Sequence, residues 1–279
     1  MFGRMAIFGL FAAALVFSPS ISLADSAPSE SISDLQLQVA ALSRLDELNL
    51  SMAQLRSAQS IGNGAADPTY IGPKEGTADP AYHDALVHLR DALATGDEGQ
   101  ISQARKDLDK VQKDAPPDAT ELVNLSDAAR RKAGDFVSLL NTSQYANFIA
   151  LHAGKIPDAA QVIFDGMDQS RHLSAVEYVH LRDRTADEVA SLIVGVQTKP
   201  PQRITSKVKN LMDKARKMSD DDYPAERDDL QKNAKSFPFM RQARAESQSH
   251  NWIARQMAEL LSNPELPEAL AARIRFLRN

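Results

Sequence analysis

The chain has 279 residues, no cysteine and a formal net charge of −5. The missing cysteines exclude disulfides, thiolate metal sites, redox pairs and cysteine nucleophiles. The mild acidity argues against nonspecific binding to nucleic acid or to anionic lipid. Without a leader of some 24 residues, about 255 remain, which is enough for one large domain or two small ones.

Residues 1–24 have the pattern of a secretory signal peptide. Arg4 supplies the positive charge, residues 7–17 are apolar, and Ser22 and Ala24 are the small residues of a cleavage site. An uncleaved anchor is the alternative, whereas a lipoprotein signal needs a cysteine that the chain lacks. We therefore expect an exported protein, periplasmic or extracellular, with no membrane span after cleavage, because no later apolar run is long enough.

The composition after the leader predicts an all-α fold, since helix formers dominate and runs of β-branched residues are almost missing. Residues 25–60 are predicted to carry one long amphipathic helix, covering 32–59. Its apolar positions follow a heptad-like spacing with one three-residue skip. The helix either packs on its own domain or forms a coiled coil with another chain. The positions predicted to make contact are Leu35, Val39, Leu42, Leu45, Leu48, Met52 and Leu55.

Residues 61–79 are rich in glycine and proline and predict a linker, because such a run cannot sustain a helix. The N-terminal helix is therefore expected to be separable from residues 80–279, an α-helical domain of packed helical hairpins. The clearest hairpin covers residues 80–95 and 97–113. Gly96 is expected to end its first helix in a left-handed conformation, and Asp97 to cap its second.

Motifs for catalysis are missing from the sequence: there is no serine elbow, phosphate-binding glycine loop or HExxH zinc motif. Glu177 and His180 form a Glu-x-x-His unit of the kind used in di-iron bundles, but no second unit accompanies it. Asp84 and His88, four residues apart, are a further weak pair of candidate metal ligands. Structural or surface roles are the simpler interpretation, so we expect no cofactor.

A basic run occupies the region after residue 198 and contains a single acid, Asp213. It fits the solvated face of one helix, and it also fits a docking patch for phosphate or an acidic polymer. Its members are Lys199, Arg203, Lys207, Lys209, Lys214, Arg216 and Lys217.

The segment Leu140-Asn141-Thr142-Ser143-Gln144 resembles the LTxxQ element of small periplasmic helical stress proteins related to spheroplast protein Y. Asn141 stands where that element has threonine, and Phe148 follows at an aromatic position. The similarity covers about nine residues, lacks the family's second copy, and implies an envelope chaperone-like role. The alternative interpretation of the same residues is a capped helix start.

Together these features predict an exported, soluble and non-enzymatic protein with a scaffold or chaperone-like role in the cell envelope. Its partner would be another protein or a second copy, bound through the N-terminal helix, with no role for nucleic acid. The alternative is a metal-binding or metal-dependent helical protein that uses Glu177 and His180.

Overall fold

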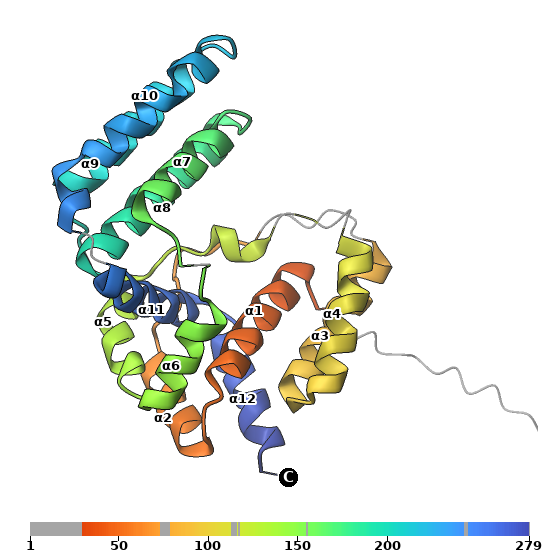
Figure 1. The fold of residues 1–279 in the computed structure, drawn as a ribbon. Helices are drawn as coiled ribbons and strands as arrows, with labels where there is room; N and C mark the ends of the chain where they lie inside the picture. Colours follow the sequence, from red (N-terminus) through yellow and green to blue (C-terminus); the bar gives the residue numbers. More distant parts are fainter. Residues whose placement is uncertain are drawn as a thin grey trace, which may run out of the picture. The chain divides into compact units, whose positions relative to one another are not determined.

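The computed structural model describes residues 30–72, 79–112, 116, 118–154, 156–242 and 245–278. Within these residues the protein contains twelve packed α-helices, two short 3₁₀ segments and no strand, so the all-α prediction is confirmed (Figure 1). The predicted signal peptide, residues 1–24, lies outside the described residues.

The helices follow one another through short connections, and their bounds are as follows. They are α1 (Ile32–Leu48), α2 (Met52–Gly62), α3 (Pro80–Thr95), α4 (Glu98–Val111), η2 (Ala119–Leu122), α5 (Asp127–Val137), α6 (Thr142–Leu151), α7 (Ala159–Ser170), α8 (Ala175–Val194), α9 (Gln202–Lys217), α10 (Asp222–Ser236), η3 (Pro238–Gln242), α11 (Ala245–Ser262) and α12 (Leu266–Phe276).

Helix α1 is a core helix, and the prediction of a separable N-terminal helix is wrong. It packs against α3, α12, η2 and α6. Residues 31–279 form one compact unit. Five of the seven predicted contact positions are buried and the other two are partly buried against the core: Leu35, Leu42, Leu45, Leu48 and Leu55, then Val39 and Met52. The apolar stripe therefore serves the chain's own domain, since a buried leucine cannot also contact a partner.

The expected continuous helix is in fact two helices, with a break at residues 49–51. Asn49 adopts a left-handed conformation (φ 46°), which asparagine tolerates better than most residues. Ser51 then begins α2 with a capping box, because its hydroxyl accepts from Gln54 N while the Gln54 side chain accepts from Ser51 N. The break lies between Leu48 and Met52, whereas the three-residue skip in the apolar pattern, from Leu42 to Leu45, falls inside α1.

Part of the predicted linker belongs to the body of the domain. Helix α2 continues to Gly62, and both Ala65 and Asp67 are buried. Asp67 N donates to Ser262 O (2.8 Å), and its carboxylate accepts from Asn124 N (2.8 Å). Residues 73–78 lie outside the described residues. The described part of this segment is thus fixed by hydrogen bonds to two distant parts of the chain.

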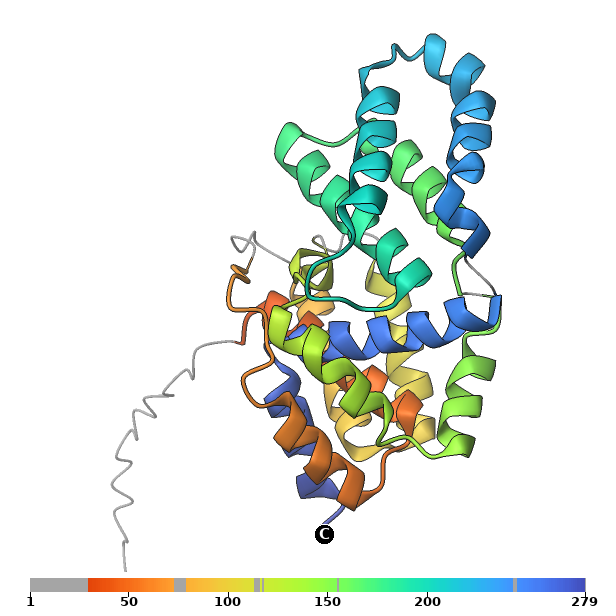
Figure 2. The same ribbon diagram turned by 90° about the vertical axis from the view of Figure 1, so that its left-hand side faces the viewer.

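The hairpin α3–α4 forms as expected: Gly96 has φ 72°, and the Asp97 carboxylate accepts from Gln100 N. A second group of helices, α7 to α10, packs together, and Figure 2 shows these helices side by side. Gly166 permits the close approach of α7 to α8, because a Cβ there would lie 2.9 Å from Thr185 Oγ1. Helix α8 is continuous from Ala175 to Val194.

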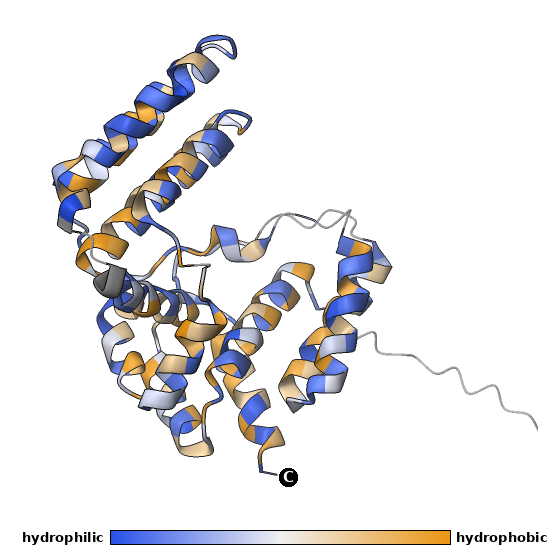
Figure 3. Ribbon diagram, in the orientation of Figure 1, coloured by the Kyte–Doolittle hydropathy of each residue, from blue (hydrophilic) through white to orange (hydrophobic). Residues whose placement is uncertain are grey.

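Apolar and polar residues alternate along the helices, as the bands of colour in Figure 3 show. In the described part of the chain, every helix is too short or too polar to cross a bilayer. Helix α8 connects the group α7 to α10 with the other helices, since it packs against α7 and α9 and also against α11. In this position α8 contributes His180, Asp183, Arg184 and Asp187 to the lining of a cavity.

Candidate functional site

The predicted metal pair does not converge. The Glu177 carboxylate accepts from Ser174 N (2.8 Å) in a capping box at the start of α8. His180 Nε2 instead lies 2.9 Å from the carbonyl oxygen of Glu121. No group of three or more histidine or acidic side chains among the described residues is arranged to hold a metal ion. Glu177 therefore has a structural role as a helix cap.

The second candidate pair, Asp84 and His88, lies on the exposed side of α3. Asp84 is 3.5 Å from His83 Nδ1, a neighbouring histidine in the sequence. Nothing else in the described residues joins these side chains to a third ligand. The structure thus assigns no metal to α3. A cavity that the sequence did not indicate is the stronger candidate for a functional site.

A cavity of about 510 Å³ lies beside α8. Its lining comes from α1, α5, α8, α9 and α11, and from the segment that includes η2 and residues 123–125. The lining includes apolar residues, among them Ala40, Val123 and Leu125, together with several charged side chains. Its volume falls in the range of about 300–1,000 Å³ that small-molecule sites occupy.

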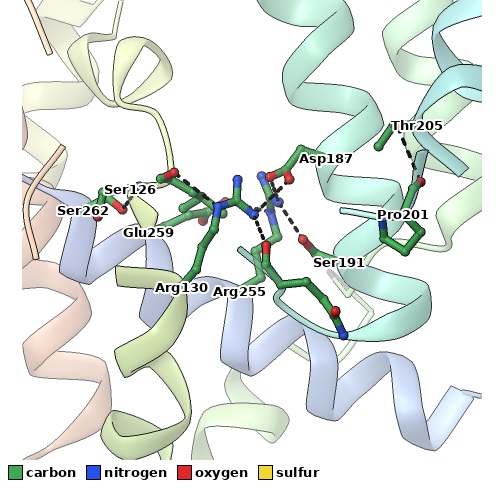
Figure 4. Close-up of polar contacts among 11 residues, drawn as sticks. Ser126, Arg130, Asp187, Ser191, Pro201, Thr205, Arg255, Glu259 and Ser262 are labelled. Atoms are coloured by element: carbon green, nitrogen blue, oxygen red, sulfur yellow. Dashed lines mark hydrogen bonds and ion pairs between the residues drawn. The ribbon is translucent and has the colours of Figure 1, made fainter. Parts of the chain in front are cut away.

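The charged part of the lining is built around Asp187, a carboxylate shared by two arginines. Arg130 Nη1 from α5 lies 2.9 Å from Asp187 Oδ1, and Arg255 Nη1 from α11 lies 2.9 Å from Asp187 Oδ2. Figure 4 shows both guanidinium groups beside the one carboxylate. Arg255 is only 3 % exposed, and it also bonds to Ser191 and Glu259. A buried guanidinium needs such partners, because a buried and unpaired charge costs several kcal/mol.

The hydrogen-bond network continues from Arg255 to the far side of the cavity. Glu259 accepts from Arg255 Nε (3.0 Å) and from Gln256 Nε2 (2.9 Å). Gln256 Oε1 in turn accepts from Arg44 Nη2 (2.5 Å), and Arg44 Nη1 pairs with Glu47 (2.8 Å). One continuous polar network therefore joins α5, α8, α11 and α1.

His152 ends this network at a small aromatic cluster. Its Nε2 lies 3.2 Å from Arg44 Nη1 and 3.3 Å from Glu47 Oε2. The ring centroids of Phe148 and Trp252 lie 4.7 Å and 5.1 Å from the ring centroid of His152. His152 thus lies partly buried among hydrogen-bond partners.

The acids that line the cavity are all paired. Asp187 and Glu259 bind the two arginines already described, and Asp183 lies 3.0 Å from Lys209 Nζ. Beside the cavity, burial raises the pKa of the Glu188 carboxyl, an effect that the charge of Arg255 opposes. The lining thus holds three acidic side chains, each with a cationic partner.

Arg184 is the exception among the cationic side chains of the lining. Its Nη1 donates to the carbonyl oxygen of Glu121 (3.3 Å), the same oxygen that His180 Nε2 contacts. No described carboxylate lies within ion-pair distance of it. Because a carbonyl oxygen only accepts, His180 Nε2 must carry the hydrogen in this contact.

The basic run of α9 is divided by the structure. Lys209 lines the cavity, whereas Arg216 Nη2 donates to the carbonyl oxygen of Leu173 (2.5 Å) and Lys207 lies over the Phe237 ring. Asp220 pairs with Arg171 rather than with this run. The run is therefore not one continuous docking patch.

The sequence does not indicate Arg44, Arg130, Arg184, Asp187 and Arg255 as a group, because they come from four helices with no common motif. One local signal existed: Arg255 and Glu259 are four residues apart and predict a pair on one face of a helix. The convergence on Asp187 depends on how α5, α8 and α11 pack. Comparison with protein-family models, with curated proteins and with solved structures found no match to this chain.

Proposed function

We propose that this is an exported, soluble and non-enzymatic binding protein, and that the cavity beside α8 is its binding site. The supporting observation is a cavity of about 510 Å³ lined by both apolar and charged residues. Pockets of this size and mixed lining are the usual sites for small molecules. The cavity takes the place of the contact surface predicted on the N-terminal helix, because the apolar residues of that helix are buried in the protein's own core.

A binding role is favoured over catalysis because the acids of the cavity are already engaged. Asp183, Asp187 and Glu259 each pair with a cationic side chain, so none is left as an unpartnered base. A general acid or base must reach the proton it transfers, at about 2.6–3.2 Å. The arrangement fits recognition by a fixed set of charges better than it fits proton transfer.

The proposed export rests on residues 1–24, and the proposed role in the cell envelope rests on that export. A scaffold or chaperone-like function would then use the cavity to hold a ligand or a partner's side chain. The metal-dependent alternative has no support in the geometry of Glu177 and His180, and we do not propose it.

Thermal unfolding with a panel of anionic, neutral and cationic small molecules tests the proposal. A ligand at about 100 times its Kd stabilises a folded protein by about 2.7 kcal/mol. We expect a subset of the panel to raise Tm, and Asn124→Trp to remove the effect by filling the cavity from its exposed lining. Ala53→Trp, at an exposed position of α2, is the control and should leave binding intact.

The proposed binding function would be rejected if no compound of any charge raised Tm. It would also be rejected if Asn124→Trp and Ala53→Trp bound equally well, because binding would then lie outside the cavity. Circular dichroism of both variants ensures that lost binding is not lost folding.

A further inference from the structure

We propose that the cavity takes a small organic anion, such as a carboxylic acid with a short apolar body, and that Arg184 binds its acidic group. This inference rests on the proposed binding function and names the chemical class of the ligand. It depends on the charge balance of the lining, on the geometry of Arg184 and on the apolar residues of the cavity.

The charges of the lining do not balance. Five cationic side chains, Arg44, Arg130, Arg184, Lys209 and Arg255, face three acidic ones, Asp183, Asp187 and Glu259. The acids are matched by Lys209, Arg130 and Arg255, and Arg44 pairs with Glu47 outside the lining. A ligand with one or two negative charges would therefore neutralise the cavity, whereas a cation would add to its excess of positive charge.

In this pairing, Arg184 is the cationic side chain of the lining that has no carboxylate partner. The contact of its Nη1 with the Glu121 carbonyl oxygen (3.3 Å) uses one of five N–H donors. The planar guanidinium favours carboxylate and phosphate oxygens, which it can bind through two parallel hydrogen bonds. In this structure it is positioned by a neutral oxygen, so an anion can approach without displacing an ion pair.

His180 lies one helical turn before Arg184 on α8, and both side chains reach the same oxygen of Glu121. This shared contact fixes the two side chains relative to each other and to the η2 segment. Residues at i and i+4 share one face of a helix, so His180 helps to hold the η2 segment beside Arg184, while its own Nε2 hydrogen is used in the contact with Glu121.

The apolar residues of the lining select for a ligand with an apolar portion. Ala40, Val123 and Leu125 are partly exposed in the cavity and offer no side-chain donor or acceptor. Burial of a ligand's methylene groups there contributes about 0.8 kcal/mol per group. A purely inorganic anion would leave this surface empty, so a short organic acid fits better.

Isothermal titration with three probes of equal length tests the inference: hexanoate, hexanamide and hexylammonium. Hexanoate should bind saturably at one site per chain, and the neutral amide at least about tenfold more weakly, since it lacks the charge that Arg184 would pair. Hexylammonium should not bind. Arg184→Gln should weaken hexanoate binding by about tenfold or more, and Arg184→Lys should bind with intermediate affinity.

Arg131→Gln provides the matched control, because Arg131 is an exposed arginine of α5 outside the lining. Equal binding of hexanoate and hexanamide, or unchanged hexanoate binding in a folded Arg184→Gln variant, would overturn the inference. If cationic or neutral compounds bound in a manner that Asn124→Trp abolished while no acid bound, the binding function would stand and the ligand class would be wrong. If no compound bound, both proposals would fail.

Discussion

The side chains of Gln54 and Gln144 cap two helices and join them to each other. Each glutamine accepts from the backbone N–H of its own helix cap, Ser51 (2.9 Å) or Asn141 (3.0 Å). Gln54 Nε2 lies 2.8 Å from Gln144 Oε1 and donates to the Leu139 carbonyl oxygen (2.6 Å). In return, Gln144 Nε2 donates to the Asn49 carbonyl oxygen (2.7 Å). Two helix starts, 90 residues apart in the chain, are thereby held together.

Gln54→Ala and Gln144→Ala should each lower the free energy of unfolding by about 1–2 kcal/mol, because each removes a cap and an interhelical bond. In the double variant the loss should be smaller than the sum by about 0.5 kcal/mol or more, since the residues contact each other. Urea denaturation measures all three. Gln103→Ala is the control, because exposed Gln103 bonds only within α4. If the losses of the two single variants added strictly in the double variant, the contact between Gln54 and Gln144 would contribute nothing to the free energy of unfolding.

The buried Arg255 should be among the most sensitive polar positions. Arg255→Met leaves Asp187 and Glu259 without one of their partners, and Asp187→Asn leaves two arginines without their shared carboxylate. Removal of one member of a buried ion pair typically costs about 3–5 kcal/mol. The matched control is Lys232→Met, in an exposed pair with Asp229, which should cost less than about 1 kcal/mol. Equal losses in urea denaturation would contradict the assigned burial.

Deletion of residues 31–59 should abolish cooperative folding rather than release a folded body. The single substitution Leu42→Ala should already cost about 2–5 kcal/mol, because Leu42 is 1 % exposed. Val176→Ala, at a position 81 % exposed, should change stability by less than about 0.5 kcal/mol. A deletion variant that retained its helical circular dichroism and a sharp thermal transition would show that the N-terminal helix is separable.

Asp168 should contribute to the loss of stability in acid. Hydrogen bonds from Arg227 chiefly, and from the Tyr223 hydroxyl, hold the pKa of its carboxyl below the ordinary value of 3.8. Because the folded-state pKa is the lower one, this contribution is complete above pH 3.8 and is lost as pH falls through the folded-state pKa. Asp168→Asn should therefore flatten the decline in unfolding free energy below about pH 4. Identical profiles for the variant and the parent would show that the contact is not retained in solution.

Export should remove residues 1–24 and leave Asp25 as the first residue. An apolar helix of about 11 residues spans about 16 Å, against a hydrocarbon core of about 30 Å, so it is a poor permanent anchor. Intact-mass measurement on the exported protein decides the matter. A retained leader in a carbonate-resistant membrane fraction would identify an anchor instead.

The segment that resembles the LTxxQ element is a capped helix start in this structure. Asn141 accepts from Gln144 N, and Gln144 returns the bond to Asn141 N. The family resemblance therefore has a local explanation in helix capping. The same pattern at Ser51 and Gln54 was available in the sequence, and it would have located the break between α1 and α2.

The sequence by itself determined the helical class, the α3–α4 turn at Gly96 and the cap of α8 at Ser174, because these depend on local propensity and on hydrogen bonds within a few residues. It also determined which face of α1 is apolar. Only the tertiary structure decided that this face is covered by the chain's own helices, because an apolar stripe has the same spacing whether it meets its own domain or a partner. The cavity was likewise decided by packing: Asp187 is 57 residues from Arg130 and 68 from Arg255, and only the arrangement of three helices brings both arginines within 3 Å of its carboxylate.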